Sequence, residues 1–111
     1  MTSDKDNQEK IQQLQLLEQN LQGFLSQKQQ FQSQLFELEN ALKEVESTKQ
    51  AYKIVGGVMV AAEKEDLKKD LSGKKEIVEL RITSIEKQEK QLQDKAKKIQ
   101  EEVIATMKKE K

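Results

Sequence analysis

The sequence predicts a mainly α-helical chain, a long antiparallel two-helix coiled-coil hairpin with a single β-hairpin at its centre. Apolar residues recur at steps of three and four along both halves of the 111-residue chain, which is the pattern of a coiled-coil seam. Between the halves lies the longest uncharged apolar stretch, residues 54–62, which contains a Gly-Gly pair. We expect one domain over residues 1–111, with helices at about 6–48 and 64–108 and a β-hairpin at about 52–61.

Composition excludes several classes of site. Charged residues make up 36% of the chain and hydrophobic residues 34%, which favours long helices over a globular core. The chain has no Pro, Cys, His or Trp, so disulfides, the usual zinc sites and Cys–His or Ser–His–Asp catalysis are not available. We therefore expect no enzymatic activity, no cofactor and no metal ion.

The N-terminal residues and the charge balance bear on location and partners. The first residues lack the apolar core of a signal peptide, and the central run is far shorter than the roughly 20 residues that span a bilayer. We expect a cytoplasmic protein that makes no use of a membrane. The 20 basic and 20 acidic side chains balance, and a group of lysines at 68–75 is interrupted by Asp70, so nucleic acid is not an expected partner.

The first helix is expected to begin with Ser3 or Asp6 as its N-cap. Nine of its ten seam positions are apolar, and the exception is Lys28. Gly23 lies off the seam and is expected to cost about 1 kcal/mol relative to alanine. The seam consists of Leu14, Leu17, Leu21, Phe24, Lys28, Phe31, Leu35, Leu38, Leu42 and Val45.

The second helix has its own seam, and the Gly-Gly turn relates the two. If Gly56 and Gly57 form a two-residue turn, paired residues have numbers that sum to 113. This register places seam against seam, and it brings Lys28 and Glu89 within one helical turn of each other. They either pair and fix the register or extend separately to water. The second seam consists of Leu71, Lys75, Val78, Ile82, Ile85, Glu89, Leu92, Ala96, Ile99 and Val103.

The central β-hairpin predicts an assembly. Both of its faces are largely apolar and both of its edges are free, and a lone two-stranded hairpin is marginal in water. We expect hairpins from several chains to pool into an intermolecular β-barrel. The alternative, a buried loop between two helices, fits the β-branched alternation and the Gly-Gly pair less well. The predicted assembly residues are Tyr52, Ile54, Val55, Gly56, Gly57, Val58, Met59 and Val60.

Near the termini, both helices carry more apolar residues than a two-helix seam requires. These are either scattered apolar residues on the surface of fraying helix ends or an adaptable apolar surface that binds another chain. Four of them lie off the seam: Ile11, Leu16, Ile104 and Met107. The full set is Ile11, Leu14, Leu16, Leu17, Ile99, Val103, Ile104 and Met107.

The stretch 45–60, with Tyr52 ahead of the Gly-Gly hairpin, resembles the β class of prefoldin subunits, and residues 79–89 are similar to archaeal β subunits. The resemblance extends from about Gln8 to Met107. It implies an α2β4 hexamer of α-type and β-class subunits, with a β-barrel body and six coiled-coil arms. Such assemblies bind non-native polypeptides, their clients, at the arm tips and transfer them to a group II chaperonin without ATP.

Applied to this sequence, the resemblance assigns client binding to the apolar residues near the termini and assembly to the hairpin. It also implies a chaperonin contact, for which the candidates are Lys108, Lys109 and Lys111. The basic position that often follows the second strand in this family is replaced here by Ala61 and Ala62. The expected function is that of an ATP-independent chaperone (holdase) subunit. The alternative is a structural coiled-coil scaffold or adaptor that binds one dedicated protein partner.

Overall fold

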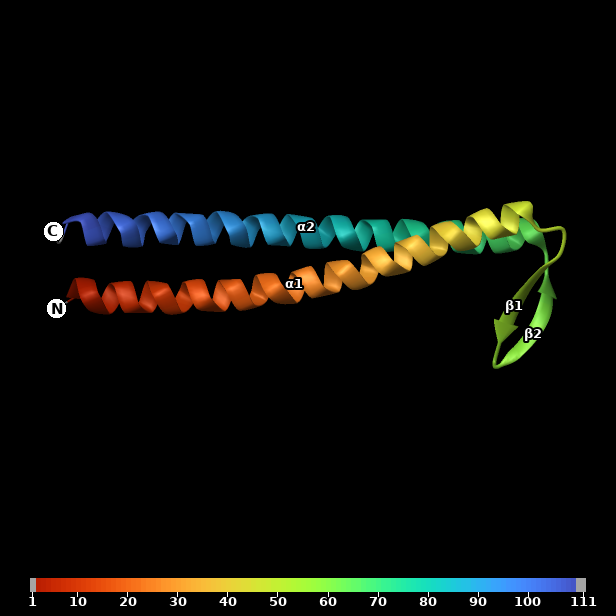
Figure 1. Ribbon diagram of the computed structural model, residues 1–111, viewed down its shortest axis with the longest axis horizontal. Helices are drawn as coiled ribbons and strands as arrows, with labels where there is room; N and C mark the ends of the chain where they lie inside the picture. Colours follow the sequence, from red (N-terminus) through yellow and green to blue (C-terminus); the bar gives the residue numbers. More distant parts are fainter. Residues whose placement is uncertain (1, 110–111) are drawn as a thin grey trace. The chain divides into compact units, whose positions relative to one another are not determined.

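The computed structural model describes residues 2–109, which form two helices and two strands (Figure 1). The order is α1 (Thr2–Ser47), β1 (Ala51–Val55), β2 (Val58–Ala62) and α2 (Lys64–Lys109). The predicted fold class, two long helices joined by a single β-hairpin, is confirmed. The helix α1 begins at Thr2, so Ser3 and Asp6 lie inside it and the predicted N-cap is wrong. Residues 2–5 contain no Gly or Pro, so nothing in this stretch stops the helix.

The chain divides into two compact units. The terminal unit consists of Met1–Lys28 and Ser84–Lys111, and the hairpin unit consists of Gln29–Thr83. Each unit contains one part of α1 and one part of α2, and the hairpin unit also contains β1 and β2. In the terminal unit, the beginning of α1 and the end of α2 lie at the same end (Figure 1).

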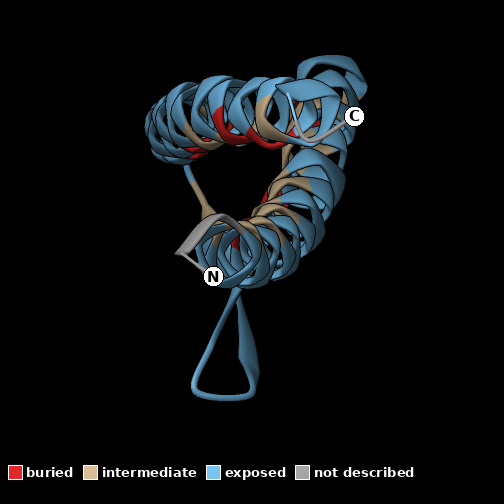
Figure 2. Cartoon of the chain, turned by 90° about the vertical axis from the view of Figure 1, so that its left-hand side faces the viewer, coloured by how far each residue is buried: buried red, intermediate tan, exposed pale blue. Residues whose placement is uncertain are grey.

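The core of each unit is formed by the predicted seam. All ten seam residues of α1 and all ten of α2 are buried or partly buried. Figure 2 shows red and tan segments, the colours of buried and partly buried residues, on both helices. In the terminal unit, Leu17, Ile99 and Val103 form a buried cluster. In the hairpin unit, Val45 and Val78 are buried. The burial of apolar side chains at steps of three and four explains why two polar helices stay together.

The β-hairpin has the predicted register. Tyr52 pairs with Ala61, and Ile54 pairs with Met59. Gly56 and Gly57 have φ angles of 55° and 80°, the positive values that a type I′ turn requires at both central residues. The alternative of a buried loop is therefore wrong, because residues 52–60 form an exposed hairpin.

Candidate functional site

The β-hairpin carries a continuous group of exposed apolar side chains. All eight predicted assembly residues are exposed, with Ile54 at 72%, and the hairpin is drawn in the exposed colour (Figure 2). We call the side chains of Tyr52, Ile54, Val55, Val58, Met59 and Val60 the hairpin surface. An exposed apolar group of this kind marks an interaction site or an aggregation hazard.

Both edges of the hairpin are available for pairing. The sheet within residues 2–109 consists of β1 and β2 alone. In a two-residue hairpin Val55 and Val58 form the hydrogen-bonded pair, so the backbone groups of Ile54 and Met59 point away from the partner strand. Lys53 is the one charged residue in the two strands, and charge and proline are the usual devices that block edge pairing. The hairpin can therefore accept a further strand on either side.

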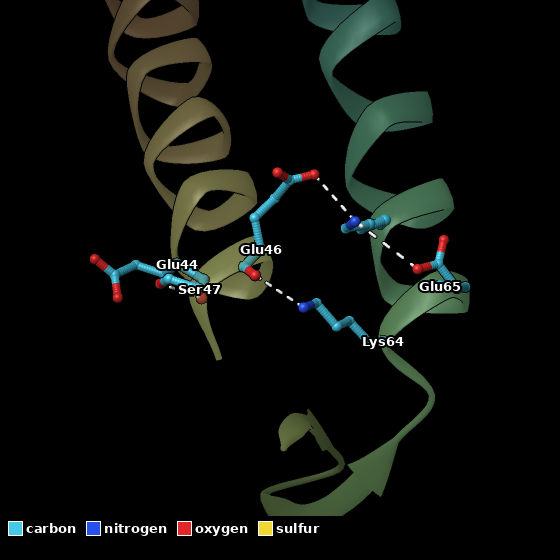
Figure 3. Close-up of polar contacts among 6 residues, drawn as sticks. Glu44, Glu46, Ser47, Lys64 and Glu65 are labelled. Carbon is cyan, nitrogen blue, oxygen red and sulfur yellow. Dashed lines mark hydrogen bonds and ion pairs between the residues drawn. The ribbon is translucent and has the colours of Figure 1, made fainter. Parts of the chain in front are cut away.

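Polar contacts hold the two helices together where the hairpin leaves them. Lys64 Nζ donates a hydrogen bond to the main-chain oxygen of Glu46 at 2.8 Å (Figure 3). Lys68 Nζ lies 3.0 Å from Glu46 Oε1. The first contact satisfies a carbonyl that the last turn of α1 leaves unpaired. The hydrogen bond and charge of Lys68 lower the pKa of Glu46, and the hydrogen bond to Glu46 raises the pKa of Lys68. These contacts join the end of α1 to the beginning of α2, on either side of the β-hairpin.

The structure separates the eight apolar residues near the termini into two groups. Leu17, Ile99 and Val103 are buried, and Leu14 packs against them, so these four belong to the core between the helices. The other four are between 44% and 58% exposed, as their positions off the seam predict. We call this group, Ile11, Leu16, Ile104 and Met107, the terminal surface.

The C-terminal lysines are only partly described. Lys108 and Lys109 lie in the last turn of α2 and are exposed, where their charge is favourable at the negative end of the helix dipole. Lys111 lies outside the described residues.

Lys28 and Glu89 form a direct pair between α1 and α2. Lys28 Nζ donates a hydrogen bond to Glu89 Oε1 at 2.8 Å, and Glu89 is 9% exposed. This geometry decides between the two expectations for these residues, because they contact one another and do not extend separately to water. Both positions lie in the seam of the terminal unit, so the pair favours the register that brings them together.

Several features of the surface were not identified from the sequence. Phe36, Ile77 and Leu80 are exposed apolar residues in the hairpin unit. In the terminal unit, a groove between the helices runs past Gly23, whose place off the seam was predicted but whose place beside a groove was not. Assigning each residue to a heptad position would have placed Phe36, Ile77 and Leu80 outside the seam as well.

Within residues 2–109, neither helix has an apolar stretch long enough to cross a bilayer. In the same range, no group of three or more acidic side chains is arranged to hold a metal ion.

Comparisons with known proteins identify the family. Residues 8–110 match the model of the prefoldin subunit family. The prefoldin subunit beta of Archaeoglobus fulgidus is 36% identical over 96 residues, covering 84% of this chain and 83% of that protein. The corresponding protein of Methanospirillum hungatei is 39% identical over 99 residues, covering 86% and 82%. The crystal structure of the prefoldin beta subunit from Thermococcus strain KS-1 matches with a TM-score of 0.87 and 34% identity, over 90% of both chains. The chain therefore belongs to the prefoldin subunit family and resembles its β-class members over most of its length.

Proposed function

We propose that this chain is an ATP-independent holdase subunit that binds non-native polypeptides through the terminal surface and transfers them to a group II chaperonin. The observation that carries the proposal is the exposure of four large apolar side chains beside a seam that is already filled. The helices do not need these side chains for their own packing. Apolar segments of an unfolded chain are the partner that such side chains fit.

The hairpin surface is the proposed assembly site. Its free edges and apolar faces support strand pairing with α-type and other β-class subunits, in a β-barrel at the centre of an α2β4 hexamer. This assembly would work in the cytoplasm. Replacing the exposed Ile54 with aspartate is expected to prevent assembly, because packing this face of the hairpin against other chains would bury a charge.

The size of the terminal surface indicates weak binding by each chain. Burying the exposed half of an Ile, Leu or Met side chain contributes about 1 kcal/mol, so four residues contribute about 4 kcal/mol. That free energy corresponds to a dissociation constant on the order of 1 mM even before association costs are subtracted. A client held at several chains at once would bind much more tightly, because the second contact forms at a high effective concentration. Assembly through the hairpin surface would therefore strengthen client binding, because it would present several terminal surfaces to one client.

The C-terminal lysines are the proposed chaperonin contact. Lys108 and Lys109 are exposed and carry two positive charges at the end of α2. Such charges would speed the approach to an acidic surface and would do so less at high salt.

The proposal can be tested with the full-length chain assembled with an α-type prefoldin subunit. In the test variant, Ile11, Leu16, Ile104 and Met107 are changed to serine. In the matched control, the exposed residues Phe36, Ile77 and Leu80 of the hairpin unit are changed to serine. Native mass measurement checks assembly, and light scattering follows the aggregation of thermally denatured citrate synthase.

We expect both variants to assemble and only the test variant to lose protection. Full protection by the test variant would show that the terminal surface is not the client site. Tight binding to one folded protein, with no binding of unfolded chains, would instead favour the scaffold or adaptor function.

A further inference from the structure

We propose that the terminal unit contains a second client site, a groove lined by side-chain amides that binds the extended main chain of a non-native polypeptide. The inference rests on the proposed function, because it concerns the same class of partner. The terminal surface would bind the apolar side chains of the non-native polypeptide, and the groove would bind its backbone.

The groove lies between α1 and α2 within the terminal unit. Phe24 and Leu92 are the two partly buried seam residues that line it, and they form an apolar floor. The exposed side chains around this floor are all primary amides. They are Gln19, Asn20, Gln27, Gln88 and Gln91. We call this feature the amide groove.

The chemistry of the amide groove matches a polypeptide backbone. Each primary amide offers two N–H donors and a carbonyl acceptor, and an extended chain presents one donor and one acceptor at almost every residue. Five amides, contributed by both helices, can satisfy either group without a fixed sequence register. A backbone pressed against an apolar floor would otherwise lose hydrogen bonds to water, which costs free energy.

The absence of charge in the groove points to the same partner. Among the described residues that line the amide groove, none is charged. A similar groove in the hairpin unit is lined by Glu37, Lys74 and Arg81 among others, and those charges would favour or reject clients by their net charge. The amide groove would accept acidic and basic clients alike, which suits a site that must bind many sequences.

Gly23 keeps the amide groove open. It lines the groove, and a Cβ at this position would meet no atom within 4 Å. A methyl group there would therefore clash with no other part of the protein, so packing within the chain does not require a glycine at this position. A larger side chain at this position would take up space beside the groove that a bound main chain would use.

The test compares Gly23→Leu with Gly23→Ala in the full-length chain assembled with an α-type subunit. Leucine and alanine both form helix better than glycine, so both variants are expected to fold and to be more stable than the parent. Binding is measured by fluorescence anisotropy with a labelled synthetic 14-residue unstructured peptide that contains Leu and Ser. A second peptide has the same sequence with N-methyl groups on alternate backbone nitrogens.

We expect Gly23→Leu to weaken binding of the unmodified peptide about tenfold, the effect of losing one or two hydrogen bonds, and Gly23→Ala to leave binding unchanged. The N-methylated peptide should bind the parent about tenfold less tightly, and Gly23→Leu should weaken that binding no further. Equal binding of both peptides to the parent would overturn the inference. So would unchanged binding of the unmodified peptide by Gly23→Leu.

These outcomes are separable from those of the proposed function. If the terminal-surface variant loses protection of citrate synthase while Gly23→Leu binds the peptide normally, the amide groove is rejected and the holdase function stands. If Gly23→Leu loses peptide binding while the terminal-surface variant still protects clients, the groove is supported and the assignment of clients to the terminal surface fails.

Discussion

Breaking the Lys28–Glu89 pair is predicted to destabilise the chain more than breaking a comparable exposed pair. Lys28 Nζ and Glu89 Oε1 are 2.8 Å apart, and their side chains are 20% and 12% exposed. Lys10 and Glu102 also join α1 to α2 within the terminal unit, at 3.6 Å and with 31% and 45% exposure. The second pair is a matched control, because it differs mainly in distance and burial.

The expected magnitude follows from that difference. At 2.8 Å and an effective dielectric constant of about 20, the attraction between unit charges is about 6 kcal/mol before desolvation is subtracted. Partial removal from water offsets most of this, and we expect a coupling free energy of about 2 kcal/mol for Lys28 and Glu89. For the exposed Lys10–Glu102 pair we expect about 0.5 kcal/mol. Lys28→Ala alone should cost about 2–3 kcal/mol, since it leaves the Glu89 carboxylate buried without a counter-charge.

The assay is urea unfolding of two double-mutant cycles at one fixed protein concentration, because assembly would shift the apparent free energy of unfolding. Each cycle uses the parent, two single alanine variants and the double variant. If the two coupling free energies agree within about 0.5 kcal/mol, burial does not strengthen the Lys28–Glu89 pair and the reasoning fails.

Three further predictions concern the turn, the base of the hairpin and the beginning of α1. Gly56→Val should destabilise the β-hairpin by about 1–2 kcal/mol, because the φ angle at this position is 55°. Gly56→Asn should be tolerated. In native mass spectra, the valine variant should lose assembly and the asparagine variant should retain it. The folded pKa of Glu46 lies below its unfolded value of about 4.5, so the stabilisation from Lys68 is complete above that pH and is lost as the pH falls through the folded pKa. NMR titration of the Glu46 carboxyl should show this, and Lys68→Met should return its pKa toward the unfolded value. Asn7 Oδ1 is buried and has no hydrogen-bond partner among the residues whose side chains the structure describes. Asn7→Leu should therefore stabilise the terminal unit by about 1 kcal/mol and slow hydrogen exchange in residues 4–14, and unchanged exchange would contradict this.

The seams and the hairpin register could be predicted because each depends on local pattern. Positive φ is inexpensive only for glycine, so Gly56 and Gly57 determine the turn, and the turn determines that Ile54 faces Met59. Steps of three and four then identify the buried face of each helix without knowledge of the other. The Lys28–Glu89 contact follows from the same register.

Other features depend on three-dimensional surroundings that a linear pattern does not contain. The seam pattern separates the buried Leu17 from the exposed Leu16, but it does not show what the exposed side chain would contact. The start of α1 at Thr2 was missed because a capping residue indicates where a helix can begin and not where it must. The hydrogen bond from Lys64 to the Glu46 carbonyl joins residues from two elements and has no sequence signature.

The unbroken seams have a consequence for how such proteins change in length during evolution. Each helix has 46 residues, and its buried positions follow steps of three and four without a skip. Inserting one residue would rotate everything beyond it by about 100° and move the apolar side chains into water. An insertion of seven keeps the seam without local overwinding or unwinding of the helix, and the fixed hairpin requires the same insertion at the matching place in the other helix. Related chains are therefore expected to differ by paired heptads, each lengthening the coiled coil by roughly 10 Å.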